Sequence, residues 1–198
     1  DAECLSVTID GTPTVPSVTD PPGNRRLQGV ELVWSDDFET DKGWTFGGEF
    51  ERGAPQGLGG LAYGNPDPST AYQGSNIIGS DLSGKGVTFG DYEPNTPDRA
   101  DSAVSPAIDC SGRVNVFIQF AMYLNVENPP WDHAYIEAFD GTDWNTVWEN
   151  DATYAFSDWQ LVAFDVSTWA DGNTGFRIRF ALGETDGSIQ YSGWNVDD

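Results

Sequence analysis

The sequence predicts an all-β protein, an antiparallel β-sandwich of the jelly-roll type. Apolar and polar residues alternate through most of the chain, which is the period of a strand with one face in a core. No segment carries an apolar stripe with the 3.6-residue period of a helix. The 23 glycines and 12 prolines mark many turns between short strands. These three observations together indicate two packed antiparallel sheets.

The first 29 residues are expected to form a short strand and a linker, ahead of a main domain that spans residues 30–198. Leu5, Val7 and Ile9 alternate with polar residues, and a stretch rich in Pro, Gly, Thr and Ser follows them. Within the main domain, residues 53–102 are polar and Gly-rich, with few alternating runs. A loop of this length inside a compact domain is usually functional, or is held in place by something other than a core.

The strand pattern is strongest in the second half of the chain. The run RVNVFIQFAMYLNV, residues 113–126, predicts one long strand whose inward face carries six apolar side chains: Val114, Val116, Ile118, Phe120, Met122 and Leu124. The segment HAYIEAFDGTDWNTVWEN, residues 133–150, predicts a hairpin that turns at Asp140-Gly141. Further strands are expected in DWQLVAFDVS, TGFRIRFAL and YSGWNV.

The charge of the chain excludes several classes of partner. Nine Lys and Arg residues stand against 32 Asp and Glu residues, so the net charge is −23. Such a surface repels phosphate backbones and anionic lipid, and we therefore expect no nucleic acid partner and no membrane surface. No run approaches 18 apolar residues, so no membrane insertion is expected either. The composition suits a secreted, extracellular protein.

Two cysteines allow one disulfide. A bond between Cys4 and Cys110 would close a loop of about 100 residues and would contribute at most about 4–5 kcal/mol through the entropy of the unfolded chain. An oxidising, extracellular location favours this bond. The alternative, that the two thiols are unrelated, stays open.

Acidic residues stand beside large apolar ones at both ends of the main domain. In WSDDFETDKGW an extended backbone would point Asp37 and Glu39 to one face and Phe38 to the other, into the core. In YSGWNVDD the residues Trp194 and Val196 would point inward, which leaves Asp197 outside. If the first and last strands lie side by side, these carboxylates converge.

Converging carboxylates repel one another unless a cation joins them. Ca²⁺ takes six to eight oxygen ligands, and Asp101 or carbonyl groups of residues 64–82 could complete its shell. We therefore expect calcium at this corner. Zinc is disfavoured, because His133 is the only histidine. The alternative, that these residues are solvated turn and edge groups, stays open.

The order of several phrases resembles a known family. DDFETDKGW, SNIIGSDLSG, DSAVSPAIDCSG and GWNVDD follow one another as in the MAM-like jelly-roll modules of secreted bacterial proteins. These include the cleaved adhesin domains of gingipain proteases and modules attached to immune-inhibitor-A-type peptidases. The resemblance covers residues 34–198. It implies a concanavalin/MAM-like sandwich, attachment to a parent catalytic domain in a longer polypeptide, and structural Ca²⁺ on Asp37, Glu39, Asp197 and Asp198.

The motifs of hydrolases are absent, and we predict that the protein is not an enzyme. The clustered acidic strand of laminarinase-like glucanases does not occur, and neither does Gly-x-Ser-x-Gly. Binding of a carbohydrate is the favoured function, because sugar rings stack on exposed aromatic side chains. We predict a contact surface around Trp131, Tyr72 and Tyr92. The alternative is a structural or adhesive module that packs on a parent protease or glycanase or grips a surface protein.

Overall fold

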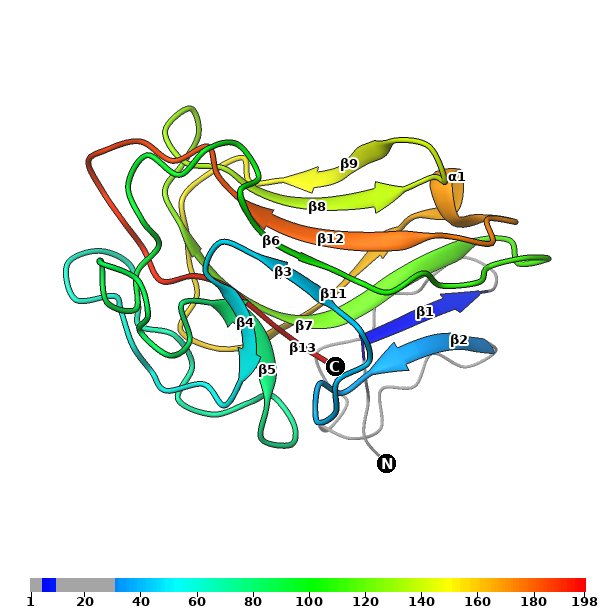
Figure 1. Ribbon diagram of the computed structural model, residues 1–198, viewed down its shortest axis with the longest axis horizontal. Helices are drawn as coiled ribbons and strands as arrows, with labels where there is room; N and C mark the ends of the chain where they lie inside the picture. Colours follow the sequence, from blue (N-terminus) through cyan, green and yellow to red (C-terminus); the bar gives the residue numbers. More distant parts are fainter. Residues whose placement is uncertain (1–4, 10–30) are drawn as a thin grey trace.

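Two antiparallel sheets pack face to face, as the alternation of the sequence predicts (Figure 1). The computed structural model describes residues 5–9 and 31–198. The all-β sandwich is therefore confirmed. The Cys4–Cys110 disulfide stays a prediction, because Cys4 lies outside the described residues, and the structure shows that the Cys110 side chain is buried. Within the described ranges no helix has the length and apolar character needed to cross a bilayer.

The larger sheet runs in the order β2-β1-β7-β13-β5-β4, and β10 and β11 also pair with β7. Its strands are β1 (Leu5–Ile9), β2 (Glu31–Asp36), β4 (Phe50–Gly53), β5 (Ile77–Ser80), β7 (Val116–Val126), β10 (Tyr154–Ala155), β11 (Gln160–Asp165) and β13 (Gly193–Asp197). The smaller sheet runs in the order β3-β6-β12-β8-β9. Its strands are β3 (Thr45–Gly47), β6 (Asp101–Val104), β8 (Ala134–Phe139), β9 (Trp144–Glu149) and β12 (Arg177–Leu182), and the short helix α1 (Ser167–Ala170) precedes β12.

The core lies between the long strand β7 and the smaller sheet. The predicted inward side chains of β7 are buried from Val116 onward, and Phe120 meets Phe180 of β12 with ring centroids 4.9 Å apart. Trp194 of β13 is fully buried, and its indole N–H donates to the carbonyl of Ala181 at 2.9 Å. Val114 departs from the prediction: it precedes the strand and is 61% exposed. Alternation alone does not mark where pairing with a neighbouring strand begins.

The first and last strands of the main domain, β2 and β13, are not neighbours, because β1 and β7 separate them in the larger sheet, which corrects the sequence-based expectation. The strand β1 pairs with residues 116–119 of β7, and β13 pairs with residues 121–125 of β7. Because β11 occupies the opposite side of β7 over residues 117–122, β1 and β13 lie end to end on one side. The C-terminus therefore ends beside the start of β1 and the end of β2 (Figure 1).

The long Gly-rich segment is held by buried carboxylates. Asp81 accepts the backbone N–H groups of Gly86 at 3.0 Å and Gly90 at 2.6 Å. Asp67 accepts the side-chain amide of Asn195, on β13, at 2.6 Å. Because these acids are buried, hydrogen bonds to carboxyl groups hold the segment in place, together with Ile78 and Tyr92, which lie in the hydrophobic core.

Candidate functional site

The connections between the strands gather at one end of the sandwich. The β7–β8 connection (residues 127–133), the β12–β13 connection (residues 183–192) and the β4–β5 connection (residues 54–76) all lie toward the left of Figure 1. Loops placed by a rigid scaffold are the usual location of binding residues. This end is therefore the first place to look for a site.

Three carboxylates meet at this end, and we call Glu127, Asp132 and Asp186 the loop-end carboxylates. One oxygen from each lies within 4.8 Å of the other two. Asp132 is fully buried and accepts both the hydroxyl of Tyr92 and the backbone N–H of Asp186, the latter at 2.8 Å. Asp186 in turn accepts the backbone N–H of Ser188 at 2.7 Å. Asp132 and Asp186 are thus fixed by these hydrogen bonds.

The electrostatics of this group fit a hard cation. Burial raises the pKa of Glu127 and of Asp132, and the charges of the neighbouring carboxylates add to the rise. Among the described residues, Oε2 of Glu127 is buried and has no hydrogen-bond partner. Oxygen ligands in this arrangement suit Ca²⁺, which would remove the repulsion.

Aromatic side chains border the loop-end carboxylates. Tyr191 and Tyr63 have ring centroids 6.2 Å apart, and Tyr63 is 45% exposed. Burial raises the pKa of the Tyr191 hydroxyl, as do the charges of Glu127 and Asp132, which places that hydroxyl near the carboxylates. Trp131 is adjacent in the chain to Asp132 and is 51% exposed.

A second acidic place lies where the chain ends meet, and we call Glu39, Asp197 and residues 73–76 the chain-end corner. Oε1 of Glu39 accepts the backbone N–H groups of Ser75 at 2.7 Å and Asn76 at 2.8 Å. Asp197 is buried, and its Oδ2 accepts the N–H of Gln73 at 3.0 Å. Burial raises the pKa of Asp197 to about 7, and the charge of Glu39 contributes.

The other predicted metal ligands are placed differently. Asp37 accepts the backbone N–H of Glu39 at 3.3 Å, and Asp198 is buried at the end of the chain. Sequence reasoning missed Asp36, which is fully buried and accepts the indole N–H of Trp44 at 2.9 Å. The sequence could have indicated this residue, because Asp36 occupies an inward-facing position at the end of the alternating strand β2.

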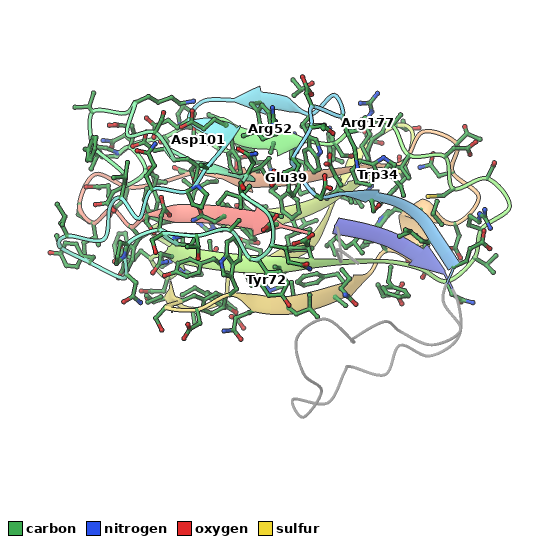
Figure 2. The ribbon with its side chains drawn as sticks, turned by 90° about the horizontal axis from the view of Figure 1, so that it is seen from below. Trp34, Glu39, Arg52, Tyr72, Asp101 and Arg177 are labelled. Carbon is green, nitrogen blue, oxygen red and sulfur yellow. The ribbon has the colours of Figure 1, made fainter. Side chains whose placement is uncertain are left out.

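Asp101 does not belong to the chain-end corner, so that prediction is wrong. It begins β6 in the smaller sheet, where its Oδ1 accepts the backbone N–H of Glu49 at 3.2 Å. Figure 2 shows Asp101 and Glu39 apart from one another. The charges that act on Asp101 come from Lys85, Glu93 and Asp81, because the pairing of β6 with β12 and β3 carries it away from the chain ends.

The three aromatic residues of the predicted contact surface do not lie together. Tyr92 is fully buried with its hydroxyl on Asp132, so it cannot contact a ligand at the surface, and that prediction is wrong. Tyr72 packs on Trp159, with ring centroids 6.3 Å apart, and its backbone lies against Asp197 at the chain-end corner. Trp131 lies instead at the loop end. Sequence reasoning missed Tyr63 and Tyr191, which stand in loops without a local pattern.

Comparison with known proteins gives only distant structural matches. No family model matches the sequence, and no curated protein matches it. Among solved structures, the C-terminal family 22 carbohydrate-binding module of Clostridium thermocellum Xyn10B has a TM-score of 0.39 and 15% identity, over 82% of this chain and 87% of that chain. A glycoside hydrolase family 43 arabinoxylan arabinofuranohydrolase from Bacillus subtilis, in complex with cellotetraose, has a TM-score of 0.37 and 13% identity, over 78% of this chain and 26% of that chain. Similarity at this level supports no argument about function.

Proposed function

We propose that the protein is a non-catalytic, calcium-stabilised accessory module of a secreted or cell-surface bacterial protein, and that its loop end binds carbohydrate. One observation carries this proposal: exposed Trp131 is adjacent in the chain to Asp132, and Tyr191, which packs on exposed Tyr63, feels the charges of Glu127 and Asp132. The phrases that the sequence shares with MAM-like modules support the accessory role.

The chemistry of this end suits a sugar. The apolar face of a pyranose ring packs on an aromatic ring such as that of Trp131, and its hydroxyl groups need acceptors or a cation. Carboxylates provide the acceptors. Calcium held by Glu127, Asp132 and Asp186 would have coordination positions left for hydroxyl oxygens, because it takes six to eight oxygen ligands.

The same group is poorly arranged for glycoside hydrolysis. The two carboxyl groups of a glycosidase lie about 5–5.5 Å apart in retaining enzymes and about 6.5–9.5 Å apart in inverting ones, on either side of the bond that breaks. Here one of the carboxyl groups, that of Asp132, is fully buried and cannot lie beside such a bond. A buried carboxylate that is already bonded to Tyr92 has no access to a substrate. These features support a binding role.

At the chain-end corner, calcium on Glu39 and Asp197, with Asp37 and Asp198 near by, would serve stability. The corner joins the bend after β2, the 73–76 loop and the C-terminal strand. A cation there would offset the repulsion that contributes to the raised pKa of Asp197.

A glycan-array screen of the full chain, run in calcium and in EGTA, tests the proposal. We expect binding to at least one glycan class in calcium, weaker binding in EGTA, and at least a tenfold loss in Trp131→Ala. Trp144→Phe is the matched control, because Trp144 begins β9 at the opposite end of the sandwich (Figure 1). Binding that Trp131→Ala leaves unchanged would contradict the proposed site.

A structural or adhesive module that packs on a parent protease or glycanase, or on a surface protein, is the second candidate. It is favoured by Leu61, Val87 and Phe89, which are exposed large apolar side chains on loops. Such side chains suit a protein surface better than a sugar. An array without binding in either condition would favour this second function.

A further inference from the structure

A third acidic group lies where the chain passes between the two sheets. We call Glu49, Asp81, Glu93 and Asp101 the inter-sheet carboxylates. Glu49 stands in the turn between β3 and β4, Asp81 follows β5, and Asp101 begins β6. Since β3 and β6 belong to the smaller sheet and β4 and β5 to the larger one, the group bridges the layers of the sandwich.

Backbone hydrogen bonds hold these carboxylates in place. Asp81 is fixed by two glycine N–H groups, as described above, and Asp101 by the N–H of Glu49. Glu93 accepts the N–H groups of Val87 and Thr88, the latter at 2.7 Å. Asp81, Asp101 and Glu93 cannot swing away without breaking these bonds.

The same residues crowd against two glycines. A methyl group on Gly86 would lie 2.3 Å from Oε1 of Glu49 and 2.8 Å from Oε1 of Glu93. A methyl group on Gly48 would lie 1.6 Å from Oδ1 of Asp101. Burial raises the pKa of Glu49 to about 7, and the charges of Asp81, Asp101 and Glu93 contribute in that order. Glu49 and Glu93 therefore both face Gly86, and Glu49 feels the charges of the other three carboxylates.

Two of their oxygens lack a partner. Asp101 is only 4% exposed, and its Oδ2 has no hydrogen bond among the described residues. Oε2 of Glu49 is likewise buried without a bond. Lys85 is the near cation, but its ammonium lies 3.5 Å from the carbonyl of Phe50 and 4.0 Å from Oε2 of Glu51. In the part of the chain that the structure describes, it makes no ion pair with the four carboxylates.

We propose that the inter-sheet carboxylates bind a divalent cation of the calcium class, with the unpaired oxygens of Asp101 and Glu49 as ligands and with Glu93 and Asp81 supplying further negative charge. Ligands made of oxygen alone suit Ca²⁺ and not Zn²⁺. The cation ties the β3–β4 turn to β5 and β6 and orders the loop that carries Val87 and Phe89. This site is separate from the chain-end corner and from the loop-end carboxylates.

Calcium titration calorimetry on the metal-free full chain tests the site. We expect Glu49→Gln and Asp101→Asn each to lose one bound Ca²⁺ per chain relative to the unmodified protein. Glu51→Gln is the matched control: it removes the same charge two positions away on β4, where Glu51 instead accepts the N–H of Ser83, and it should bind as many ions as the unmodified chain. An ion count that Glu49→Gln and Asp101→Asn leave unchanged would overturn the proposal.

Thermal melts separate a metal site from a merely structural role. In EGTA both variants should melt at or above the temperature of the unmodified chain, because a repelling charge is gone. In calcium they should melt below it. Equal destabilisation in both conditions would overturn the proposal. Glu49 is partly exposed, so Glu49→Gln gives the answer even where Asp101→Asn fails to fold. Glu39→Gln and Asp186→Asn test calcium binding at the chain-end corner and at the loop-end carboxylates, respectively.

Discussion

Substitution of Asp197 by Asn should change the stability of the protein in opposite directions with and without calcium. Asp197 is buried beneath the 73–76 loop, with its Oδ2 on the N–H of Gln73. Asparagine keeps an acceptor oxygen for that N–H and removes the charge. Without a cation the buried charge destabilises the fold, whereas with a cation the carboxylate serves as a ligand.

The size of the effect follows from the raised pKa. The pKa of Asp197 rises from 3.8 to about 7, because burial and the charge of Glu39 disfavour the carboxylate. A folded pKa above the unfolded one means that stability falls as the pH rises, here between about 4 and 7. Three pH units at about 1.4 kcal/mol each give a cost on the order of 4 kcal/mol at pH 8. For a chain of this length, that corresponds to a shift in melting temperature of roughly 10 °C.

Thermal melts from pH 4 to pH 8, in EGTA and in calcium, measure this. In EGTA we expect Asp197→Asn to match the unmodified protein at pH 4 and to exceed it at pH 8; in calcium the order at pH 8 should reverse. Asp158→Asn, at an exposed carboxylate, is the control for loss of one charge. The reasoning is refuted if Asp197→Asn is the less stable protein at pH 8 in EGTA.

Two further predictions concern the loops. Burial raises the pKa of Asp67 far above its usual value, so its stabilising contribution is present below pH 4 and declines as the pH rises. Asp67→Asn, which can keep a bond to Asn195, should remove this decline in the free energy of unfolding, measured by urea unfolding at pH 5 and pH 8. The idea is wrong if the variant and the unmodified chain lose the same stability between these two pH values. Gly74→Ala would place a methyl group 2.4 Å from Oε1 of Glu39 at a φ of +65°, and calorimetry should show weaker calcium binding at the chain-end corner. Gly172→Ala, with a φ of +71° and open space around it, carries the backbone strain of about 1–2 kcal/mol alone and should leave calcium binding intact.

The core was predictable because it depends on a local pattern. Alternation placed β7, β12 and the β8–β9 hairpin at the right residues, and the inward side chains from Val116 onward are buried. The start of β7 was predicted three residues too early, at Arg113 instead of Val116, because strand pairing is a property of two segments and not of one.

The polar interior was not predictable from alternation. A period of two assigns Asn195 to the outer face of β13, and the outer face is assumed to meet solvent. Here the Gly-rich segment covers that face, so Asn195 is fully buried and bonds to Asp67. Tyr92, which belongs to the same segment, is also fully buried. Long loops that fold back over a sheet leave no periodic signal in the sequence.

The acidic sites differ in how well the sequence predicts them. Glu39 and Asp197 stand beside large apolar residues near the two ends of the main domain, which made their meeting a reasonable expectation. Glu127, Asp132 and Asp186 come from two connections more than 50 residues apart, and no local motif joins them. Asp101 was expected to complete the calcium shell at the chain-end corner, but strand pairing put it on the other sheet.

The central claim is that the carboxylates which the fold forces together are cation ligands. Anomalous diffraction from crystals soaked in Tb³⁺, a luminescent and strongly scattering substitute for Ca²⁺, tests it directly. We expect anomalous density between Glu127, Asp132 and Asp186, at the chain-end corner, and beside Asp101. Saturating soaks that leave all three places without anomalous density would contradict it.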